Sequence, residues 1–264
     1  MSAITSGVSQ QYADSSKLAA RARLHREFSV GEPWFSWVMD RLPLAAGDSV
    51  LDIGCGPAWF WAGSEGHFPA GLHLTLADQS EGMVKEATER CAPLGFASVT
   101  GQQADVTALP FADASFDVVI AMHMLYHVAD QEKAVAELHR VLKPGGTLAV
   151  TNNGAGNLKQ LYALTTVFGS PPIDPAAVAF GHERAESLLG AAFGNVTKTV
   201  CPGGLHVTDA EVVFMALTSY PPGDRASDTE LEAFRSAIAA AFAAGGGALD
   251  VQKDAALFLS RKPG

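Results

Sequence analysis

Apolar side chains recur at helical spacing near the start of the chain. The pattern covers residues 15–28 and repeats over residues 32–42, which predicts two leading helices. Residues 45–48 (Ala-Ala-Gly-Asp) break this pattern. Residues 49–53 then form a short apolar run that ends in glycines, as a buried parallel strand does. We therefore expect N-terminal helices in front of a sheet.

Further runs with the character of strands follow, and helix-like or loop segments separate them. They cover residues 72–77, 98–102, 116–121 and 147–151, with 196–201 and 255–260 able to complete the sheet. The segment between the fourth and fifth runs has one apolar face over residues 131–142 and stops at Lys-Pro-Gly-Gly, a typical end of a helix. Strands that alternate with helices predict a parallel sheet.

The alternation changes after residue 151. A helix-like segment over residues 158–168 and a proline-rich loop at 170–175 follow, and two more helical patterns occupy 209–219 and 229–244. We expect an α/β fold: a Rossmann-like, seven-stranded, mostly parallel sheet with helices on both faces, N-terminal helices and a cap insertion after the fifth strand.

The length is compatible with a single domain over residues 1–264. Its expected parts are N-terminal helices or a lid (1–44), a ligand-binding core (45–151), a cap insertion (152–195) and a C-terminal segment that completes the sheet (196–264).

Composition and charge narrow the function classes. The chain is 48% hydrophobic, 17% charged and carries a formal charge of −10, which is typical of a globular protein and disfavours a nucleic-acid partner. Its three cysteines are far apart with no Cys-x-x-Cys pair, so neither a disulfide framework nor a zinc site is predicted. The start lacks signal-peptide features, and no apolar run is long enough for a membrane span. We expect a cytoplasmic protein without a metal.

Residues 50–58 (Val-Leu-Asp-Ile-Gly-Cys-Gly-Pro-Ala) carry the first candidate chemistry. A strand that runs into a glycine turn lets backbone approach a ligand, although such turns are as often structural. Asp52 places a carboxylate beside the turn, where a ligand with an amino group or sulfonium could use it. A dinucleotide loop would need a small residue at position 59, where this chain has Trp59, so the loop disfavours NAD.

A second acid follows the next predicted strand. Asp78 comes directly after the run 72–77, at the position where a carboxylate in a Rossmann-like sheet accepts hydrogen bonds from ribose hydroxyls. The alternative is a solvated aspartate between a strand and a helix that begins at Ser80. The two acids together favour a nucleoside-containing ligand.

Five motifs in this order resemble those of class I S-adenosylmethionine (SAM)-dependent methyltransferases. They are residues 50–58, 76–78 (Leu-Ala-Asp), 104–106 (Ala-Asp-Val), 109–111 with 116–119 (Leu-Pro-Phe and Phe-Asp-Val-Val) and 142–146 (Leu-Lys-Pro-Gly-Gly). The resemblance covers residues 49–151. It departs from the family at Ala58, where a third glycine is frequent.

The resemblance implies SAM as the cofactor and a role for each matching residue. Asp52, Gly54 and Gly56 would border the methionine moiety. Asp78 would hold the ribose hydroxyls, and Asp105 would accept the adenine amino group. The remaining wall would consist of Ala104 and Val106 beside the adenine, and Met122.

Histidines follow the fourth predicted strand. His123 is the first candidate for a general base, because imidazole titrates near neutral pH. His127 lies four residues further on and would share a face with His123 if a helical turn began there; a structural role is favoured for it. Weaker candidates for pocket contacts are Tyr12, Trp59, His182 and His206.

We therefore expect an enzyme that methylates a small molecule by in-line displacement. Two alternatives stay open: a SAM-binding protein of this fold without transferase activity, as a regulatory or partner subunit, and a protein that uses SAM for non-methyl chemistry. The sequence leaves the acceptor atom (O, N, C or S), the need for a base, the pathway and the oligomeric state undetermined.

Overall fold

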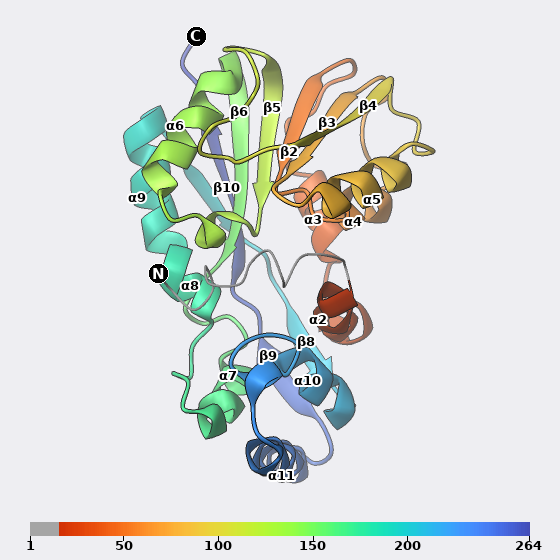
Figure 1. Ribbon diagram of the computed structural model, residues 1–264, viewed down its shortest axis with the longest axis vertical. Helices are drawn as coiled ribbons and strands as arrows, with labels where there is room; N and C mark the ends of the chain where they lie inside the picture. The colour runs from red at the N-terminus through yellow and green to blue at the C-terminus, as the bar shows by residue number, and fades with distance from the viewer. Residues whose placement is uncertain (1–15) are drawn as a thin grey trace.

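The computed structural model describes residues 16–264, with side chains from Ala19 onward. A sheet of seven strands, in the order β4-β3-β2-β5-β6-β10-β7, forms the upper part of the molecule in Figure 1. Its strands are β2 (Ser49–Ile53), β3 (His73–Asp78), β4 (Ser98–Gln103), β5 (Phe116–Met122), β6 (Leu142–Asn153), β7 (Thr197–Val200) and β10 (Ala255–Arg261). Strands β2 to β6 pair in parallel, whereas β10 is antiparallel to both β6 and β7. The predicted Rossmann-like, mostly parallel sheet is confirmed.

Strand β2 lies between β3 and β5, and the strand order reverses there. Asp52 is in register with Leu76 of β3 on one side and with Ile120 of β5 on the other. In open α/β sheets, ligands bind outside the carboxyl ends of the strands at such a reversal. The topology therefore places the predicted cofactor loop at the favoured position.

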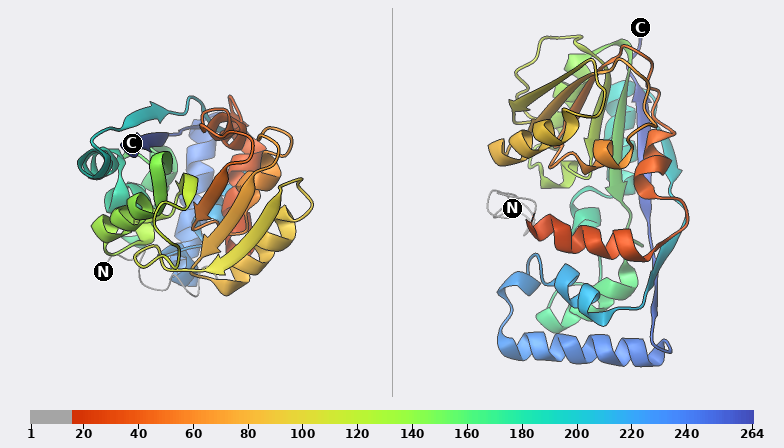
Figure 2. Two further views of the ribbon diagram at one scale, coloured as in Figure 1. Left: turned by 90° about the horizontal axis from the view of Figure 1, so that it is seen from above. Right: turned by 90° about the vertical axis from the view of Figure 1, so that its right-hand side faces the viewer.

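Helices cover both faces of this sheet, as predicted (Figures 1 and 2). Leu51 packs with α6 (Gln131–Val141) and α9 (His182–Phe193), while its neighbour Val50 packs with the helices of the opposite face. Alternate residues of a strand point to opposite faces, so this apolar run buries both sides. The helices on the Val50 face are α3 (Trp34–Met39), α4 (Trp59–Gly63) and α5 (Glu81–Cys91).

A second part of the molecule lies beyond the carboxyl edge of the sheet, and we call it the cap (Figure 2). It holds a small antiparallel sheet in the order β1-β8-β9 and its own hydrophobic cluster. The cap consists of α2 (Ser16–Phe28), β1 (Ser29–Val30), α7 (Lys159–Leu164), η2 (Thr165–Phe168), β8 (Gly204–Val207), α10 (Ala210–Leu217), η3 (Gly223–Arg225), α11 (Asp228–Ala244) and β9 (Leu249–Gln252).

The cap comes from three separate segments of the chain. The insertion after β6 supplies α7 and η2, but α8 (Pro175–Phe180) and α9, from the same stretch, pack against the main sheet through Phe180, Leu189 and Phe193. The stretch between β7 and β10, expected only to complete the sheet, supplies most of the cap. The sequence pattern missed this because β8 and β9 have only four residues each.

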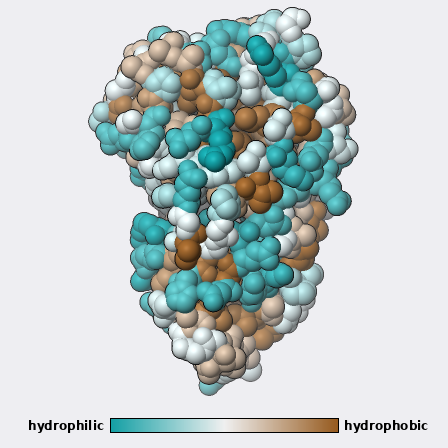
Figure 3. All heavy atoms as spheres, turned by 180° about the vertical axis from the view of Figure 1, so that it is seen from behind, coloured by the Kyte–Doolittle hydropathy of each residue, from teal (hydrophilic) through white to brown (hydrophobic). Residues whose placement is uncertain are grey.

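The surface carries no extended apolar face in the view of Figure 3. Hydrophobic residues there lie in small separate groups among hydrophilic ones. No helix within residues 16–264 is long and apolar enough to cross a bilayer.

Candidate functional site

The glycine loop after β2 is hydrogen-bonded to the neighbouring strand β3. The backbone N–H groups of Gly54 and Cys55 both donate to the carbonyl oxygen of Ala77, over 2.7 and 3.1 Å. Gly54 has φ of +70°, and a Cβ added there would lie 2.7 Å from Cβ of Met124. Met124, which sequence reasoning missed, therefore packs directly against the loop. Glycine is required at position 54 by both its φ and this contact.

Gly56 stands in open space by contrast. A Cβ added to it would meet nothing within 4 Å, so the backbone of the loop is accessible at this point. Its N–H donates to Oδ2 of Asp78 over 3.0 Å, and the N–H of Ser80 donates to Oδ1 over 2.9 Å. Each carboxylate oxygen accepts more than one hydrogen bond. Asp78 thus holds the loop in place and keeps acceptor capacity for a ligand.

Asp52 is a buried acid beneath the loop. Only 3% of it is exposed, and its Oδ2 accepts a hydrogen bond from Nε1 of Trp61 over 2.9 Å. Burial raises the pKa of Asp52 to about 7, against the hydrogen bond from Trp61, and the charge of Asp78 raises it further. Burial also raises the pKa of Asp78, against its backbone hydrogen bonds. A cationic ligand would stabilise the ionised form of both carboxyls.

The third acid follows β4, so the three acids end adjacent strands. The N–H of Ala104 donates to the carbonyl of Asp78 over 2.9 Å, which ties the two strand ends together. Ala104 and Val106 are buried, whereas Asp105 between them is exposed. Oδ1 of Asp105 accepts from the N–H and the hydroxyl of Thr107. Its Oδ2 has no hydrogen-bond partner among the described residues.

Met122 is the last residue of β5, the other neighbour of β2, and it is half-buried against the core of the Val50 face. The carboxyl edge of β4, β3, β2 and β5 thus gathers all eight predicted cofactor residues.

His123 follows β5 in a left-handed backbone conformation, with φ of +49°. Such a conformation costs a residue other than glycine about 1–2 kcal/mol. Its N–H is held by the carbonyl oxygen of Thr151 (3.1 Å) and by Oγ1 of the same residue (3.2 Å). Its ring lies 5.4 Å from the ring of Trp34. Burial lowers the pKa of His123 to about 4, and the charge of Lys253 lowers it further, so the imidazole is neutral at neutral pH.

His127 lies on a different side of the sheet from His123. No helical turn begins at position 123; a 3₁₀ turn, η1 (Leu125–His127), starts two residues later. The His127 ring contacts Tyr126, which packs on the Leu51 face, whereas Trp34 beside His123 packs on the Val50 face. The structure therefore does not bring the two imidazoles onto a shared face.

The weaker candidates lie apart from one another. Nδ1 of His182 is 3.8 Å from Oδ1 of Asp254, and Nδ1 of His206 is 2.8 Å from the carboxylate of Asp250 in the small sheet. Trp59 begins α4, next to the glycine loop. Tyr12 lies outside the described residues.

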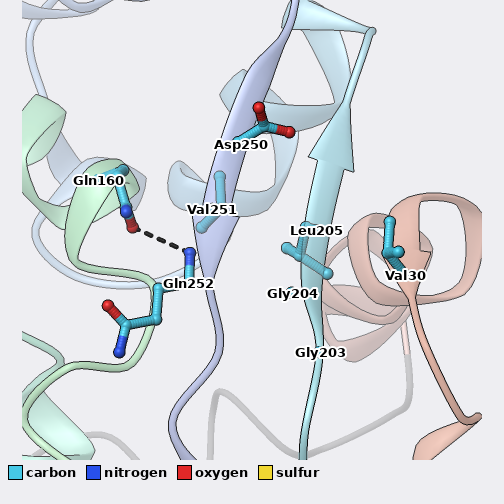
Figure 4. Close-up of a pocket in the computed structure, with 8 residues that line it drawn as sticks. All are labelled: Val30, Gln160, Gly203, Gly204, Leu205, Asp250, Val251 and Gln252. Atoms are coloured by element: carbon cyan, nitrogen blue, oxygen red, sulfur yellow. Dashed lines mark hydrogen bonds between the residues drawn. The ribbon is translucent and has the colours of Figure 1, made fainter.

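An open groove of about 360 Å³ lies on the small sheet of the cap (Figure 4). Residues of β1, α7, β8 and β9 line it, and none of the predicted site residues does. Within residues 16–264, no cluster of three or more His, Cys, Asp or Glu side chains could hold a metal ion.

Comparison with known proteins matches the region that carries this site. Residues 51–150 match the family described as "Methyltransferase domain". Over 117 residues the chain is 40% identical to demethylmenaquinone methyltransferase of Renibacterium salmoninarum, covering 44% of this chain and 46% of that protein. Over 113 residues it is 40% identical to 27-O-demethylrifamycin SV methyltransferase of Amycolatopsis mediterranei, covering 41% of this chain and 40% of that protein.

A solved structure extends the likeness of the fold to nearly the whole chain. The phosphoethanolamine N-methyltransferase 2 of Haemonchus contortus, in complex with SAM, superposes with a TM-score of 0.61 at 18% identity, over 99% of this chain and 60% of that one. The matching stretches span less than half the length of the two relatives above. The likeness of the fold thus covers 99% of this chain, whereas the family match is confined to residues 51–150.

Proposed function

We propose that this chain, whose residues 51–150 form a class I SAM-dependent methyltransferase domain, transfers a methyl group from SAM to a small-molecule acceptor. The observation that carries the proposal is the row of acids at three adjacent strand ends, Asp52, Asp78 and Asp105, with Asp78 bonded to the open loop at Gly56. A nucleoside with a charged amino-acid tail matches this row in chemistry.

The described residues fit SAM as follows. The free acceptor capacity of Asp78 serves the ribose hydroxyls, and Oδ2 of Asp105 serves the adenine amino group. Ala104 and Val106 flank the adenine with apolar surface. The open backbone at Gly56 and the turn at Gly54 border the methionine moiety, and Met122 completes the wall.

Asp52 supports this assignment electrostatically. Its carboxyl has a pKa of about 7, raised chiefly by burial, so at neutral pH it is only partly ionised in the unliganded loop. A nearby ammonium or sulfonium favours the ionised carboxylate. Asp52 would therefore become fully ionised when the cationic cofactor binds, and its negative charge would balance the positive charge of the cofactor.

Bound SAM supplies an activated methyl group on a sulfonium, so the protein mainly positions the acceptor in line and removes a proton where the acceptor carries one. His123 suits the second task. It is neutral, its ring orientation is supported by Thr151 through the backbone and by Trp34, and it follows the strand next to the glycine loop. His127 contacts Tyr126 instead, and we assign it a structural role.

A small acceptor in the cytoplasm is the remaining part of the proposal. The net charge of −10 disfavours nucleic acid, and the relatives are named for demethylmenaquinone and demethylrifamycin SV, both small molecules. All three cysteines are unpaired, which accords with a reducing compartment. The acceptor lies between the sheet edge and the cap, where inserted segments usually set specificity.

The test is product analysis with the full chain. The protein is incubated with SAM and a panel of phenols, carboxylic acids, amines and thiols, and products are identified by mass spectrometry together with S-adenosylhomocysteine (SAH). The proposal predicts SAH and an acceptor heavier by one CH₂ group, with both products strongly reduced in Asp78→Ala. SAM consumption that gives other products, or cofactor binding without turnover of any acceptor, would replace methyl transfer with one of the alternatives.

A further inference from the structure

The link between β4 and β5 carries the adenine side of the proposed cofactor site. Residues 104–115 form neither helix nor strand, and the link runs towards α6 before it enters β5 (Figure 1). The N–H of Ala104 donates to the carbonyl oxygen of Asp78 over 2.9 Å, and the N–H of Ala108 donates to the carbonyl oxygen of Asp105 over 3.0 Å. Asp105 thus lies in a short turn whose beginning is fixed to the sheet.

Two side chains of α6 hold the other end of this turn. Leu109 follows the turn directly, is 5% exposed, and packs in the core cluster that also contains Val135 and Leu138 of α6. Its backbone N–H donates to Oε2 of Glu137 over 2.8 Å, and its carbonyl oxygen accepts from Nη2 of Arg140 over 3.0 Å. Both polar backbone groups of Leu109 are therefore bonded to α6.

Glu137 and Arg140 also bind each other through two parallel hydrogen bonds. Nε of Arg140 donates to Oε1 of Glu137 over 2.7 Å, and Nη2 donates to Oε2 over 2.8 Å. Nη1 donates to the carbonyl oxygen of Phe111 over 2.7 Å and to Oδ1 of Asp113 over 2.8 Å. A guanidinium has five N–H groups, and each of them has an acceptor here. The two side chains are 29% and 21% exposed, so this network is better shielded than an isolated surface ion pair.

The pair is charged at neutral pH. The hydrogen bonds from Arg140 hold the pKa of the Glu137 carboxyl below its usual range, and the bonds to Glu137 and Asp113 raise the pKa of Arg140. Hydrogen bonds with an ionised partner are roughly twice as strong as those between neutral groups. The two bonds to Leu109 therefore hold the backbone of the link firmly.

We propose that Glu137 and Arg140 are positioning residues that aim Asp105 at the adenine amino group of the cofactor, and that they thereby make the site selective for adenine. The inference rests on the proposed function, because it concerns the cofactor side of that site. Neither side chain acts on the adenine directly; the pair fixes Leu109 and with it the turn that begins at Asp105. Oδ1 of Asp105 is bonded to Thr107 within the turn, so the direction of Oδ2 follows that of the turn.

The test compares two ligands by isothermal titration calorimetry: SAH and S-inosylhomocysteine, in which an oxo group replaces the adenine amino group. Oδ2 of Asp105 can accept a hydrogen bond from the amino group, whereas the oxo oxygen cannot donate one. The wild type should therefore bind SAH ~10-fold or more tightly than the inosine compound. Asp105→Ala gives the affinity ratio of a site that lacks this contact.

Variants of α6 locate the effect. Arg140→Met and Glu137→Ala should each lower the affinity ratio by ~5-fold or more, toward the value of Asp105→Ala. The double variant should lose no more than either single one, because the two side chains act as a unit. Arg140→Lys keeps the charge but lacks the planar fork that reaches several acceptors, so it should lose the preference as well.

Asp113→Ala is the matched control. It removes the one partner of Arg140 whose side chain is 79% exposed, and it leaves the bonds to Leu109 in place. Its affinity ratio should equal that of the wild type. Circular dichroism and the melting temperature show that each variant is folded during the titration; if Arg140→Met is unfolded, Glu137→Ala and Arg140→Lys carry the test. A general weakening of the site lowers the affinity for both ligands alike, so it leaves their ratio unchanged.

The outcomes separate this inference from the proposed function. Failure of the wild type to bind SAH overturns the proposed function. Equal affinity of the wild type for SAH and S-inosylhomocysteine overturns the inference, because Asp105 then does not recognise the amino group. A wild-type affinity ratio in folded Glu137→Ala and Arg140→Lys overturns it too, because the link would then hold Asp105 in place without α6.

Discussion

The cofactor edge of the sheet and its junction with the cap differ in construction. The edge presents Asp52, Asp78 and Asp105 at three consecutive strand ends, within 54 residues of sequence. The junction involves segments that lie far apart in the sequence, because the cap combines α2 with the insertion after β6 and the stretch between β7 and β10. A site built from local motifs thus lies next to a part of the molecule that only tertiary assembly produces.

The similarity to known proteins divides along the same line. The methyltransferase match ends at residue 150, before the insertion and the long stretch that form most of the cap. Relatives named for demethylmenaquinone and for demethylrifamycin SV match less than half of this chain. Fold and cofactor site are common to many enzymes, while surrounding segments set specificity, so the cap is where this chain would differ from them.

Replacement of Asp78 gives the largest effect expected at the acidic edge. Asp78→Ala removes the acceptor for the ribose hydroxyls and the bond to Gly56, which together are worth about 3–6 kcal/mol. We expect SAH affinity to fall by more than ~100-fold, as measured by calorimetry. Asp113→Ala, at the opposite edge of the sheet and paired with Arg140, is the control. Unchanged affinity in Asp78→Ala would place the cofactor elsewhere.

The two loop glycines should respond differently to the same substitution. In Gly54→Ala the new Cβ meets Met124 at 2.7 Å, and steric overlap with a positive φ should lower the free energy of unfolding by about 3 kcal/mol. In Gly56→Ala the new Cβ contacts no protein atom within 4 Å. The free energy of unfolding should therefore change by only about 1 kcal/mol, while the affinity for SAH falls. Urea denaturation and calorimetry give both values. Equal SAH affinity in Gly56→Ala and wild type would mean that this backbone borders no ligand.

The variant His123→Ala separates the chemistry of the acceptor from binding of the cofactor. We expect turnover to fall by ~100-fold with SAH affinity retained, because the imidazole serves the acceptor and not the cofactor. His73→Ala, at the start of β3 and bonded to Ser98, is the control. Near-normal turnover would remove His123 from the mechanism without affecting the cofactor site.

The smallest effect concerns pH and the buried acid. The pKa of Asp52 is about 7 when folded, raised mainly by burial, against 3.8 for an ordinary aspartate. The folded chain therefore holds a proton that the unfolded chain loses, and stability contributed by Asp52 falls as pH rises from about 4 to about 7. His25 and His123, with lowered pKa values, give the opposite slope.

The comparison of wild type with Asp52→Asn isolates this contribution. Asn lacks the titration but can still accept the hydrogen bond of Trp61. Between about pH 5 and about pH 6.5, the wild type should lose about 2 kcal/mol of unfolding free energy relative to the variant. Parallel pH profiles would show that Asp52 is already ionised without cofactor.

The sequence predicted the sheet and its edge because their signals are local. The strands that carry Asp52 and Asp78 are short, largely buried runs, whereas β4 before Asp105 is mostly polar and exposed. The alternation of strands with helices still placed all three acids at strand ends before the fold was known. The cap could not be derived in this way. Its small sheet consists of short strands that pair over large sequence separations, such as Ser29 with Leu205, and no local pattern encodes such pairing.

The same reason explains why sequence reasoning missed Met124. The contact of Met124 with Gly54 depends on how β5 lies beside β2. His123 and His127 do not share a face, because the backbone adopts a left-handed conformation at His123 and the helical turn on which a shared face depended does not begin there.

Calorimetric titration of the unmodified chain with SAH, and in parallel with NADH, tests the central claim most directly. If the edge formed by Asp52, Asp78 and Asp105 is a SAM site, SAH binds at one site per chain and raises the melting temperature, while NADH does neither. No binding heat and an unchanged melting temperature at saturating SAH would contradict the account.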